Sequence, residues 1–285
     1  MRVNLIDVDG SYPNLALMKL SAYWKGQGAD VALNSARQAD HVFISVVFRE
    51  NLLKAQKIQR AIGGTIGGSG TGDYSIVLSP EIEHQCPDYS LYGLDYSMGF
   101  TSRGCFRPCG FCIVRAKEGG VKEWSPLTEF VRHEKVVLMD NNFLASPMWR
   151  EKLMEMIAMK VKVDFNQGLD IRLLNEENSA LLAGLAPPYL RFAWDSMDLF
   201  PNIKRGIRLL RDAGCKVDRY HVGFYVLTGY DTTPKQDLYR LDFLHRLNIN
   251  THVQPFIKNR QNNRISRWGN SPMIWKKCRF SRYTA

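Results

Sequence analysis

The sequence lacks the long hydrophobic runs that membrane-spanning proteins need. No stretch of about 18 consecutive apolar residues occurs, so no membrane-spanning helix is predicted. The first residues, Met-Arg-Val-Asn-Leu-Ile-Asp, are typical of a strand and lack the apolar segment and cleavage site of a signal peptide. Only six cysteines occur in 285 residues, which is too few for a disulfide scaffold. These absences predict a cytoplasmic protein with reduced thiols and no membrane contact.

Acidic side chains are missing from residues 257–285. The whole sequence has a formal net charge of +10, and this segment holds eight positive side chains. Its aromatic residues are Trp268, Trp275, Phe280 and Tyr283. Such a basic extension could follow a phosphate backbone and stack bases, which indicates nucleic acid as a partner. Alternatively, the aromatic residues pack beneath the main domain and the charges are solvated. The positive residues are Lys258, Arg260, Arg264, Arg267, Lys276, Lys277, Arg279 and Arg282.

Three of the cysteines, Cys105, Cys109 and Cys112, form a C-x3-C-x2-C pattern that follows Gly-Phe-Thr-Ser-Arg-Gly. Thiolates this close together can bind one soft metal centre. A structural zinc site and a cubane iron–sulfur cluster usually take four protein ligands, and no fourth Cys or His lies nearby in the sequence. Three ligands leave one iron of a cubane open to a small molecule, whereas a structural zinc would need a distant fourth ligand.

On this motif the chain resembles the radical S-adenosylmethionine (radical SAM) superfamily. The resemblance implies that Cys105, Cys109 and Cys112 hold a [4Fe–4S] cluster whose open iron binds the amino and carboxylate groups of S-adenosylmethionine (SAM). It implies reductive cleavage of SAM to a 5′-deoxyadenosyl radical, and a reductant such as flavodoxin or ferredoxin. The other three cysteines share no close spacing, so no second cluster is predicted. They are Cys86, Cys215 and Cys278.

Residues 1–95 predict a small Rossmann-like α/β domain. Strands are expected at residues 3–8, 30–33 and 41–47, with a helix between residues 13 and 28. This front end resembles the cobalamin-binding-type domains that precede many radical SAM cores. The corresponding stretch, Asp7-Val8-Asp9-Gly10-Ser11-Tyr12-Pro13, has no histidine to bind cobalt, so cobalamin is not expected. The glycine-rich residues 63–72 match no phosphate-loop pattern and are interpreted as a strand-to-loop connection.

Residues 96–256 predict a regular βα alternation. Strands are expected just before Cys105 and at residues 135–139, 161–165, 190–194, 221–227 and 250–256. Helices are expected to begin near Ser146-Pro147, at Asn175 and at a capping box over residues 233–236. Another helix, residues 201–214, should bury Ile203, Ile207 and Leu210. With the resemblance, this pattern implies a partial (β/α)6 barrel, the radical SAM core.

Polar side chains follow the predicted strands, where parallel barrels bind their ligands. The resemblance implies that Asp140, Asn141 and Asn142 contact the amino group of SAM, with a simple helix-entry turn as the alternative. It implies that the next strand end presents Gln167, Asp170 and Arg172, and that Arg172 pairs with the SAM carboxylate unless it forms a surface salt bridge. The remaining implied contacts are Asp195 and Ser196 with the ribose, the strand ending at Thr228 with the adenine, and Phe111 beside the adenine.

The sequence therefore predicts an enzyme that begins radical chemistry on an unidentified substrate. The basic extension favours nucleic acid as that substrate, while a peptide or small metabolite remains open. A zinc-loaded, non-catalytic adaptor is the alternative from another class. No general acid or base can be named; Tyr225, Tyr230 and Gln254 are candidate lining groups.

Overall fold

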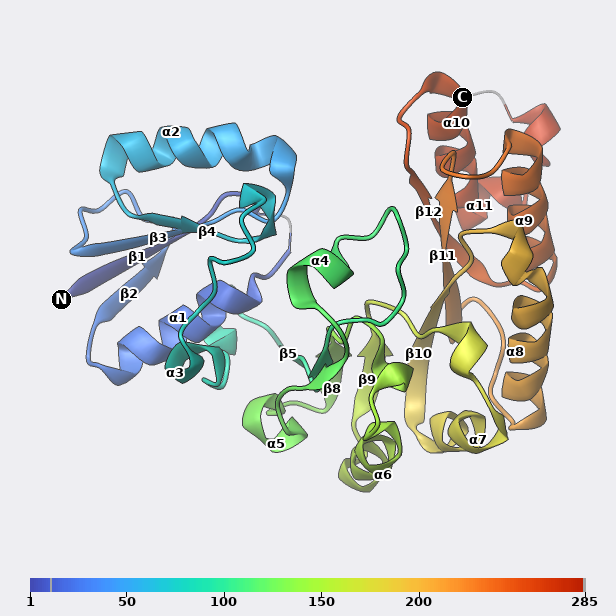
Figure 1. The fold of residues 1–285 in the computed structure, drawn as a ribbon, viewed down its shortest axis with the longest axis horizontal. Coiled ribbons are helices and arrows are strands. Elements are labelled where there is room, and N and C mark those ends of the chain that lie inside the picture. The colour runs from blue at the N-terminus through green and yellow to red at the C-terminus, as the bar shows by residue number, and fades with distance from the viewer. Residues whose placement is uncertain (11, 284–285) are drawn as a thin grey trace.

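The computed structural model describes residues 1–10 and 12–283, and it contains two parallel sheets with helices around them (Figure 1). This arrangement confirms the predicted α/β class. Position 11 of the stretch examined for a cobalt ligand and residues 284–285 of the basic extension lie outside the described residues. Within them, no helix is both long and apolar enough to cross a membrane.

The first sheet has the order β2-β1-β3-β4, with all strands parallel. Apolar side chains from the two faces of β1 enter different clusters: Val3 and Leu5 pack with α1, whereas Ile6 packs with Ala55 of α2. Helices therefore cover both faces of the sheet and shield its central strands from solvent. The elements are β1 (Arg2–Asp7), α1 (Leu15–Gly26), β2 (Asp30–Leu33), β3 (His41–Ser45), α2 (Leu52–Ile62) and β4 (Thr65–Gly67).

The glycine-rich stretch brings β4 and the turn after it very close to the end of β3. A Cβ atom on Gly68 would lie 2.3 Å from the carbonyl oxygen of Val46, and one on Gly70 would lie 3.0 Å from that of Phe48. Gly68 also has a φ of +105°, a conformation that side chains disfavour. Close backbone packing thus accounts for these glycines without a phosphate ligand.

The second sheet has the order β12-β11-β10-β9-β8-β5, and all of its strands are parallel. Six strands follow one another across the sheet in chain order, as the βα alternation predicted. The described sheet is open, with β5 and β12 at its edges. The strands are β5 (Ser97–Gly99), β8 (Lys135–Leu138), β9 (Lys162–Phe165), β10 (Ala186–Ala193), β11 (Val222–Thr228) and β12 (Asn250–Pro255).

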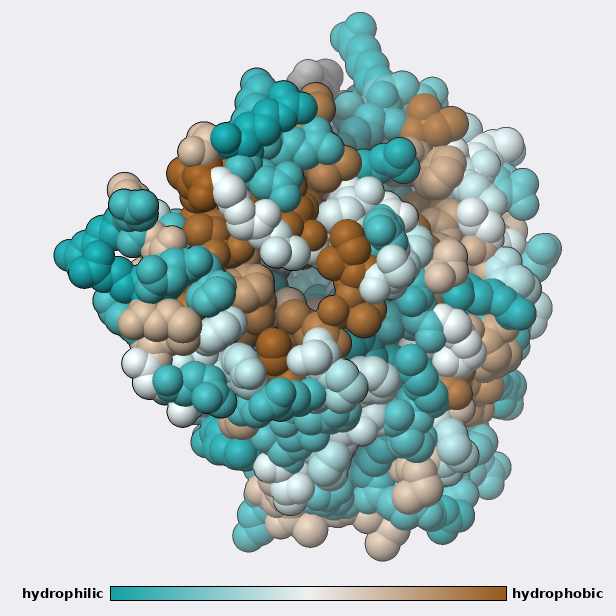
Figure 2. All heavy atoms as spheres, turned by 60° about the vertical axis from the view of Figure 1, so that its left-hand side comes forward, coloured by the Kyte–Doolittle hydropathy of each residue, from teal (hydrophilic) through white to brown (hydrophobic). Residues whose placement is uncertain are grey.

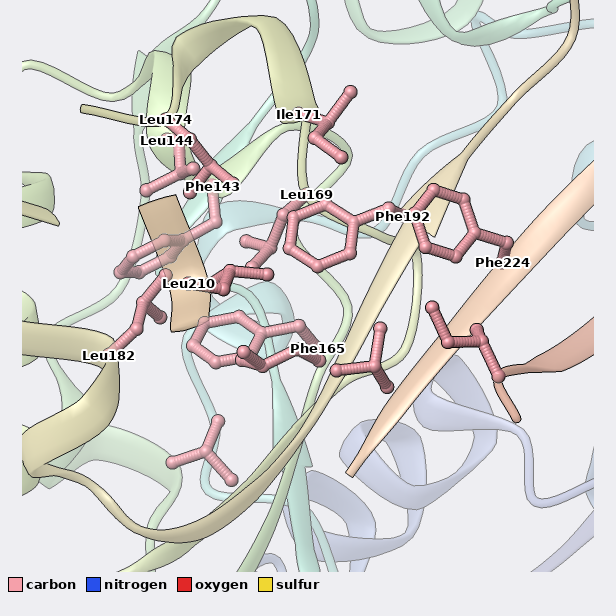
Figure 3. Packing of buried hydrophobic residues seen from close by; sticks show 14 of the residues in the cluster. Phe143, Leu144, Phe165, Leu169, Ile171, Leu174, Leu182, Phe192, Leu210 and Phe224 are labelled. Carbon is pink, nitrogen blue, oxygen red and sulfur yellow. The ribbon is translucent and has the colours of Figure 1, made fainter. Parts of the chain in front are cut away.

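Helices cover the outer face of the second sheet and enclose the main core. Phe165, Phe192 and Phe224 from three neighbouring strands are at most 2% exposed and pack together with helix residues such as Leu210 (Figure 3). Burying side chains of this size is the main stabilising contribution of the fold. The helices are α6 (Trp149–Met159), α7 (Glu176–Gly184), α8 (Phe200–Asp212), α9 (Pro234–Arg246) and α10 (Arg260–Gly269).

Most predicted helix starts are confirmed, and one is wrong. Capping boxes at Asn175 and Thr233 open α7 and α9. The prediction that α8 buries Ile203, Ile207 and Leu210 also holds. The helix expected at Ser146 begins at Trp149 instead, since the Ser146 hydroxyl donates to Glu123 at 2.5 Å and accepts from the Met148 amide in a turn.

The basic extension folds onto the second sheet through α10 and α11 (Pro272–Trp275). Trp268 is 5% exposed, and the Trp275 ring stacks on His245 of α9 with a centroid distance of 4.1 Å. Phe280 and Tyr283 also contact the main core. The aromatic residues therefore pack against the domain, which was the second of the two alternatives, and they do not form an open base-stacking platform.

Candidate functional site

The three cysteines lie on a loop at the carboxyl edge of the second sheet. Two short strands, β6 (Ser102–Arg103) and β7 (Lys122–Glu123), pair antiparallel and close the base of the loop. Between them lie the cysteines and the short helix α4 (Val114–Glu118), seen above β8 in Figure 1. Gly104 has a φ of +88°, and a Cβ atom there would lie 2.1 Å from the Gly120 carbonyl oxygen. The cysteine loop, residues 104–121, thus starts where only glycine fits.

Asp140, expected to contact a ligand, instead anchors the start of the cysteine loop. Its carboxylate accepts hydrogen bonds from the amide and hydroxyl groups of both Thr101 and Ser102, at 2.6–2.7 Å. Asp140 is 3% exposed, and this burial raises the pKa of its carboxyl despite the bonds from Ser102 and Thr101. The Asp140 oxygens thus already face four donors of the protein, while a contact of Asp140 with the SAM amino group stays a prediction.

Asn141 and Asn142 lie directly beside the first cysteine. The Asn141 side-chain oxygen accepts from the Gly104 amide at 2.9 Å. The Asn142 Nδ2 atom lies 3.5 Å from the Cys105 sulfur, which also accepts from the Arg107 amide at 3.4 Å. Hydrogen bonds of this kind stabilise a thiolate and tune a metal bound to it. The two asparagines thus position the loop and one candidate ligand.

A carboxylate on the loop after β9 holds the other side of the cysteine loop. Asp170 accepts from Arg107 Nε at 2.8 Å and from Arg172 Nε at 2.6 Å. Burial alone raises the pKa of Asp170, but the hydrogen bonds and charges of Arg172 and Arg107 offset this and lower it. The guanidinium of Arg172, expected to pair with a ligand carboxylate, is engaged with Asp170, so in this structure the salt-bridge alternative describes it.

Cys109 is influenced by charged groups from two neighbouring strand ends. Burial raises the pKa of its thiol, the neighbouring Cys112 and Cys105 raise it as well, and the positive charge of Arg172 lowers it. Asp195 also acts on Cys109, so the ends of β9 and β10 both face the cysteine loop. Burial raises the pKa of Asp195, whose Oδ1 accepts from the Leu227 amide at 3.2 Å.

Aromatic rings connect the cysteine loop to the last two strands. Phe111 meets the edge of Tyr230 at a centroid distance of 5.3 Å, and Tyr230 meets Phe256 at 4.8 Å. A Cβ atom on Gly110 would lie 2.5 Å from the Tyr230 hydroxyl. Phe111 therefore faces the loops that follow β11 and β12, the side of the sheet where the adenine was expected.

The other residues predicted to contact SAM differ in their burial and in their hydrogen bonds. Gln167 is exposed. Ser196 caps a turn, since its hydroxyl accepts from the Asp198 amide at 3.3 Å. Thr228 is fully buried, and its hydroxyl has no hydrogen-bond partner among the described residues. Asn142 Oδ1 is likewise buried without a partner within the described ranges. These two polar atoms at strand ends therefore have hydrogen-bonding capacity that the described residues do not use.

The donor chemistry of the loop fits an iron–sulfur cluster, whereas its present geometry is open. All three thiols are free, and Cys112 is exposed. Over residues 1–10 and 12–283, no three His, Cys, Asp or Glu side chains are gathered closely enough to hold a metal ion. Binding a cluster would therefore require the cysteines to converge around it.

Sequence reasoning missed Arg107 and the four donors from Thr101 and Ser102. Arg107 stands inside the cysteine motif, but no local pattern links it to Asp170, 63 residues further along the chain. A pairing of this kind depends on how strands lie side by side, which one sequence does not reveal.

Comparison with known proteins adds no relationship. No protein-family model matches the chain, and no curated protein matches its sequence.

Proposed function

We propose that this chain is a radical SAM enzyme whose Cys105, Cys109 and Cys112 hold a [4Fe–4S] cluster. The observation that carries the proposal is the placement of three free thiols on one loop at the carboxyl edge of a six-stranded parallel sheet. Ligands of parallel α/β sheets bind at this edge. When bound, the cluster and SAM would supply a one-electron cleavage that starts radical chemistry.

The polar groups around the loop support this proposal. Asn142 and the Arg107 amide would donate to the sulfur of Cys105, and Asp140 and Asn141 would hold the strand that leads to it. Asp195 and the unpartnered Thr228 hydroxyl offer acceptors and donors for a polar cofactor between β10 and β11. Phe111 and Tyr230 would exclude water from one side of the site.

Nucleic acid is the substrate class that we favour. The eight positive side chains of residues 257–285 lie on a folded segment, so they could position a phosphate backbone without the aromatic residues. A peptide or a small metabolite would not require this charge.

Anaerobic reconstitution with iron and sulfide tests the proposal. We expect a brown protein with one cluster per chain that cleaves SAM when reduced. Cys109→Ala should lose the visible absorbance and the cleavage, whereas Cys278→Ala, a cysteine outside the motif, should keep both. A colourless protein that binds zinc, or iron that persists in Cys109→Ala, would overturn the assignment in favour of a metal-binding adaptor.

A further inference from the structure

The inner face of the second sheet, opposite the helix-covered face, is divided into two halves. At β5 and β8 this face is apolar: Met98, Val137 and Met139 pack with Met18 and Tyr89 from the segment before the sheet. At β10, β11 and β12 the residues on the same face are polar or aromatic. They are Tyr189, Arg191, Tyr225, Asn250 and His252.

The register of the strands places these side chains in two rows. Arg191, Gly223 and Asn250 lie side by side in one row, because each is paired with the next across the sheet. Tyr225 and His252 lie in the row above, and their rings meet edge to face at 5.5 Å. The glycine in the middle of the first row leaves room for the Tyr189 ring, which lies against it.

Tyr189, Gly223 and Asn250 line a cavity of about 170 Å³. The Tyr189 side chain packs directly on Gly223, since a Cβ atom there would lie 2.7 Å from the Tyr189 hydroxyl. Asn270 and Pro272, which follow α10, form the outer wall. Its volume is well below that of pockets for drug-sized ligands, so it has room for one small ring system.

The charged group in the cavity is neutralised and held rigid. Arg191 donates to both oxygens of Asp164, at 2.8 and 2.7 Å, and its guanidinium lies 4.7 Å from the Tyr189 ring centre. Burial and the nearby Arg191 lower the pKa of His252, which keeps that ring uncharged at neutral pH. In the part of the chain that the structure describes, the cavity wall thus carries no net charge, which disfavours an isolated anion or cation inside it.

One polar atom of a lining residue has no hydrogen-bond partner in the described part of the chain. Asn250 Oδ1 is buried and has no partner among the described residues, although its Nδ2 donates to the Arg219 carbonyl at 2.9 Å. A buried acceptor without a donor is costly, so a ligand N–H group that reached this oxygen would be stabilising. Flat aromatic surfaces, an uncharged wall and an unsatisfied acceptor together describe the complement of a heterocycle.

We propose that this cavity binds a single flat, uncharged, hydrogen-bonding ring of the nucleobase class. Bases are bound in this way when they leave a stack: aromatic side chains cover their faces, and polar groups read their edges. The inference that this ring belongs to the enzyme's substrate rests on the proposed function. The inference that the cavity binds such a ring does not.

A chain of contacts joins the cavity to the cysteine loop. The Tyr225 hydroxyl donates to the Asn166 carbonyl at 2.6 Å, at the end of β9. The loop that follows carries Asp170, which binds Arg107. A base in the cavity would lie nearer the amino ends of β11 and β12, on the strands whose carboxyl ends face the cysteine loop.

Nucleoside binding to the full chain, purified without iron, tests the proposal. Uridine, cytidine, adenosine and guanosine would be titrated by calorimetry, with ribose as the control ligand. We expect at least one nucleoside to bind and ribose not to bind. Tyr189→Leu should weaken binding at least about fivefold, the lower end of what one base–aromatic stack contributes. Gly223→Ala should weaken it similarly by displacing the Tyr189 hydroxyl, whereas Gly26→Ala, with open space around its Cβ, should not.

The outcomes separate this proposal from the previous one. Absence of nucleoside binding, equal binding of ribose, or binding that survives Tyr189→Leu and Gly223→Ala but is lost in Phe111→Ala would overturn the cavity assignment. Circular dichroism of each variant checks that it is folded. Failure to assemble a cluster would overturn the radical chemistry and leave the cavity result unaffected.

Discussion

Arg107 and Asp170 are joined by a hydrogen-bonded ion pair of 2.8 Å that connects the cysteine loop to the end of β9. The Asp170 side chain is 6% exposed and the Arg107 side chain 26%, so the pair is largely shielded from solvent. Together with Asp140 on the other side, it fixes both ends of the segment that carries Cys105. The ligand loop is therefore held by carboxylates that belong to two different strand ends.

Asp170→Asn should destabilise the protein by about 2 kcal/mol at neutral pH, because it removes a charged acceptor shared by two arginines. The folded pKa of Asp170 is lowered below its usual value of 3.8, so its contribution is present above that pH and is lost as the pH falls through the folded pKa. Urea unfolding at pH 7 and pH 3 should show that the difference in unfolding free energy between the variant and the wild type is smaller at pH 3. Asp95→Asn, at an exposed carboxyl group, is the control. An unfolding free-energy difference that is the same at both pH values would contradict this account.

Asp140→Asn should cost about 3 kcal/mol, because an amide nitrogen cannot accept the hydrogen bonds that Thr101 and Ser102 donate. The start of the cysteine loop should loosen as well. Limited proteolysis within residues 104–121 measures this, and cleavage should be faster than in the wild type. Unchanged cleavage together with unchanged stability would show that the loop is held by other contacts.

Arg240→Met should destabilise the fold by about 3–5 kcal/mol. Arg240 and Asp237 are completely buried, and the guanidinium also donates to the carbonyl groups of Trp194 and Leu227 at the ends of β10 and β11. The substitution removes the counter-ion of the buried Asp237 carboxylate, to which the Thr232 hydroxyl still donates, and it removes the donors to the two carbonyls. Chemical denaturation measures the effect, with Arg246→Met, at an exposed pair with Asp242, as the matched control. Equal midpoints for the two variants would contradict the prediction.

His245 should make stability depend on pH near neutrality. Burial lowers its pKa to about 3, so the unfolded chain binds a proton below pH 6.5 that the folded chain does not. Stability should fall by up to about 1.4 kcal/mol per pH unit as the pH drops below 6.5. His245→Phe keeps an aromatic ring beside Trp275 and should flatten this dependence, while losing the contact with Thr251. Parallel curves for both proteins would exclude His245 as the cause.

Local patterns predicted much of the fold. The capping residues Asn175 and Thr233 begin helices because their side chains satisfy amide groups a few residues away. The stripe of Ile203, Ile207 and Leu210 depends only on helical period. The helix start predicted at Ser146 was wrong because the Ser146 hydroxyl forms its hydrogen bonds within a turn and with Glu123.

The site was less predictable than the fold. Asp140 and Arg172 have the chemistry of ligand-binding groups, yet both are engaged by partners within the protein. Thr101 lies 39 residues from Asp140 in the chain, and Arg107 lies 63 from Asp170. The likeness to radical SAM enzymes identified the cysteines, but could not show which neighbouring side chains were already satisfied.

By itself, the sequence determined the α/β class, through its alternation of strands and helices, and the presence of three closely spaced thiols, because each depends on residues near one another in the chain. Only the tertiary structure decided which carboxylates anchor the cysteine loop, that the aromatic residues of the basic extension are packed, and that Tyr189, Arg191 and Asn250 line one cavity. These features arise from strand register and from hydrogen bonds between distant residues, which local propensities do not encode.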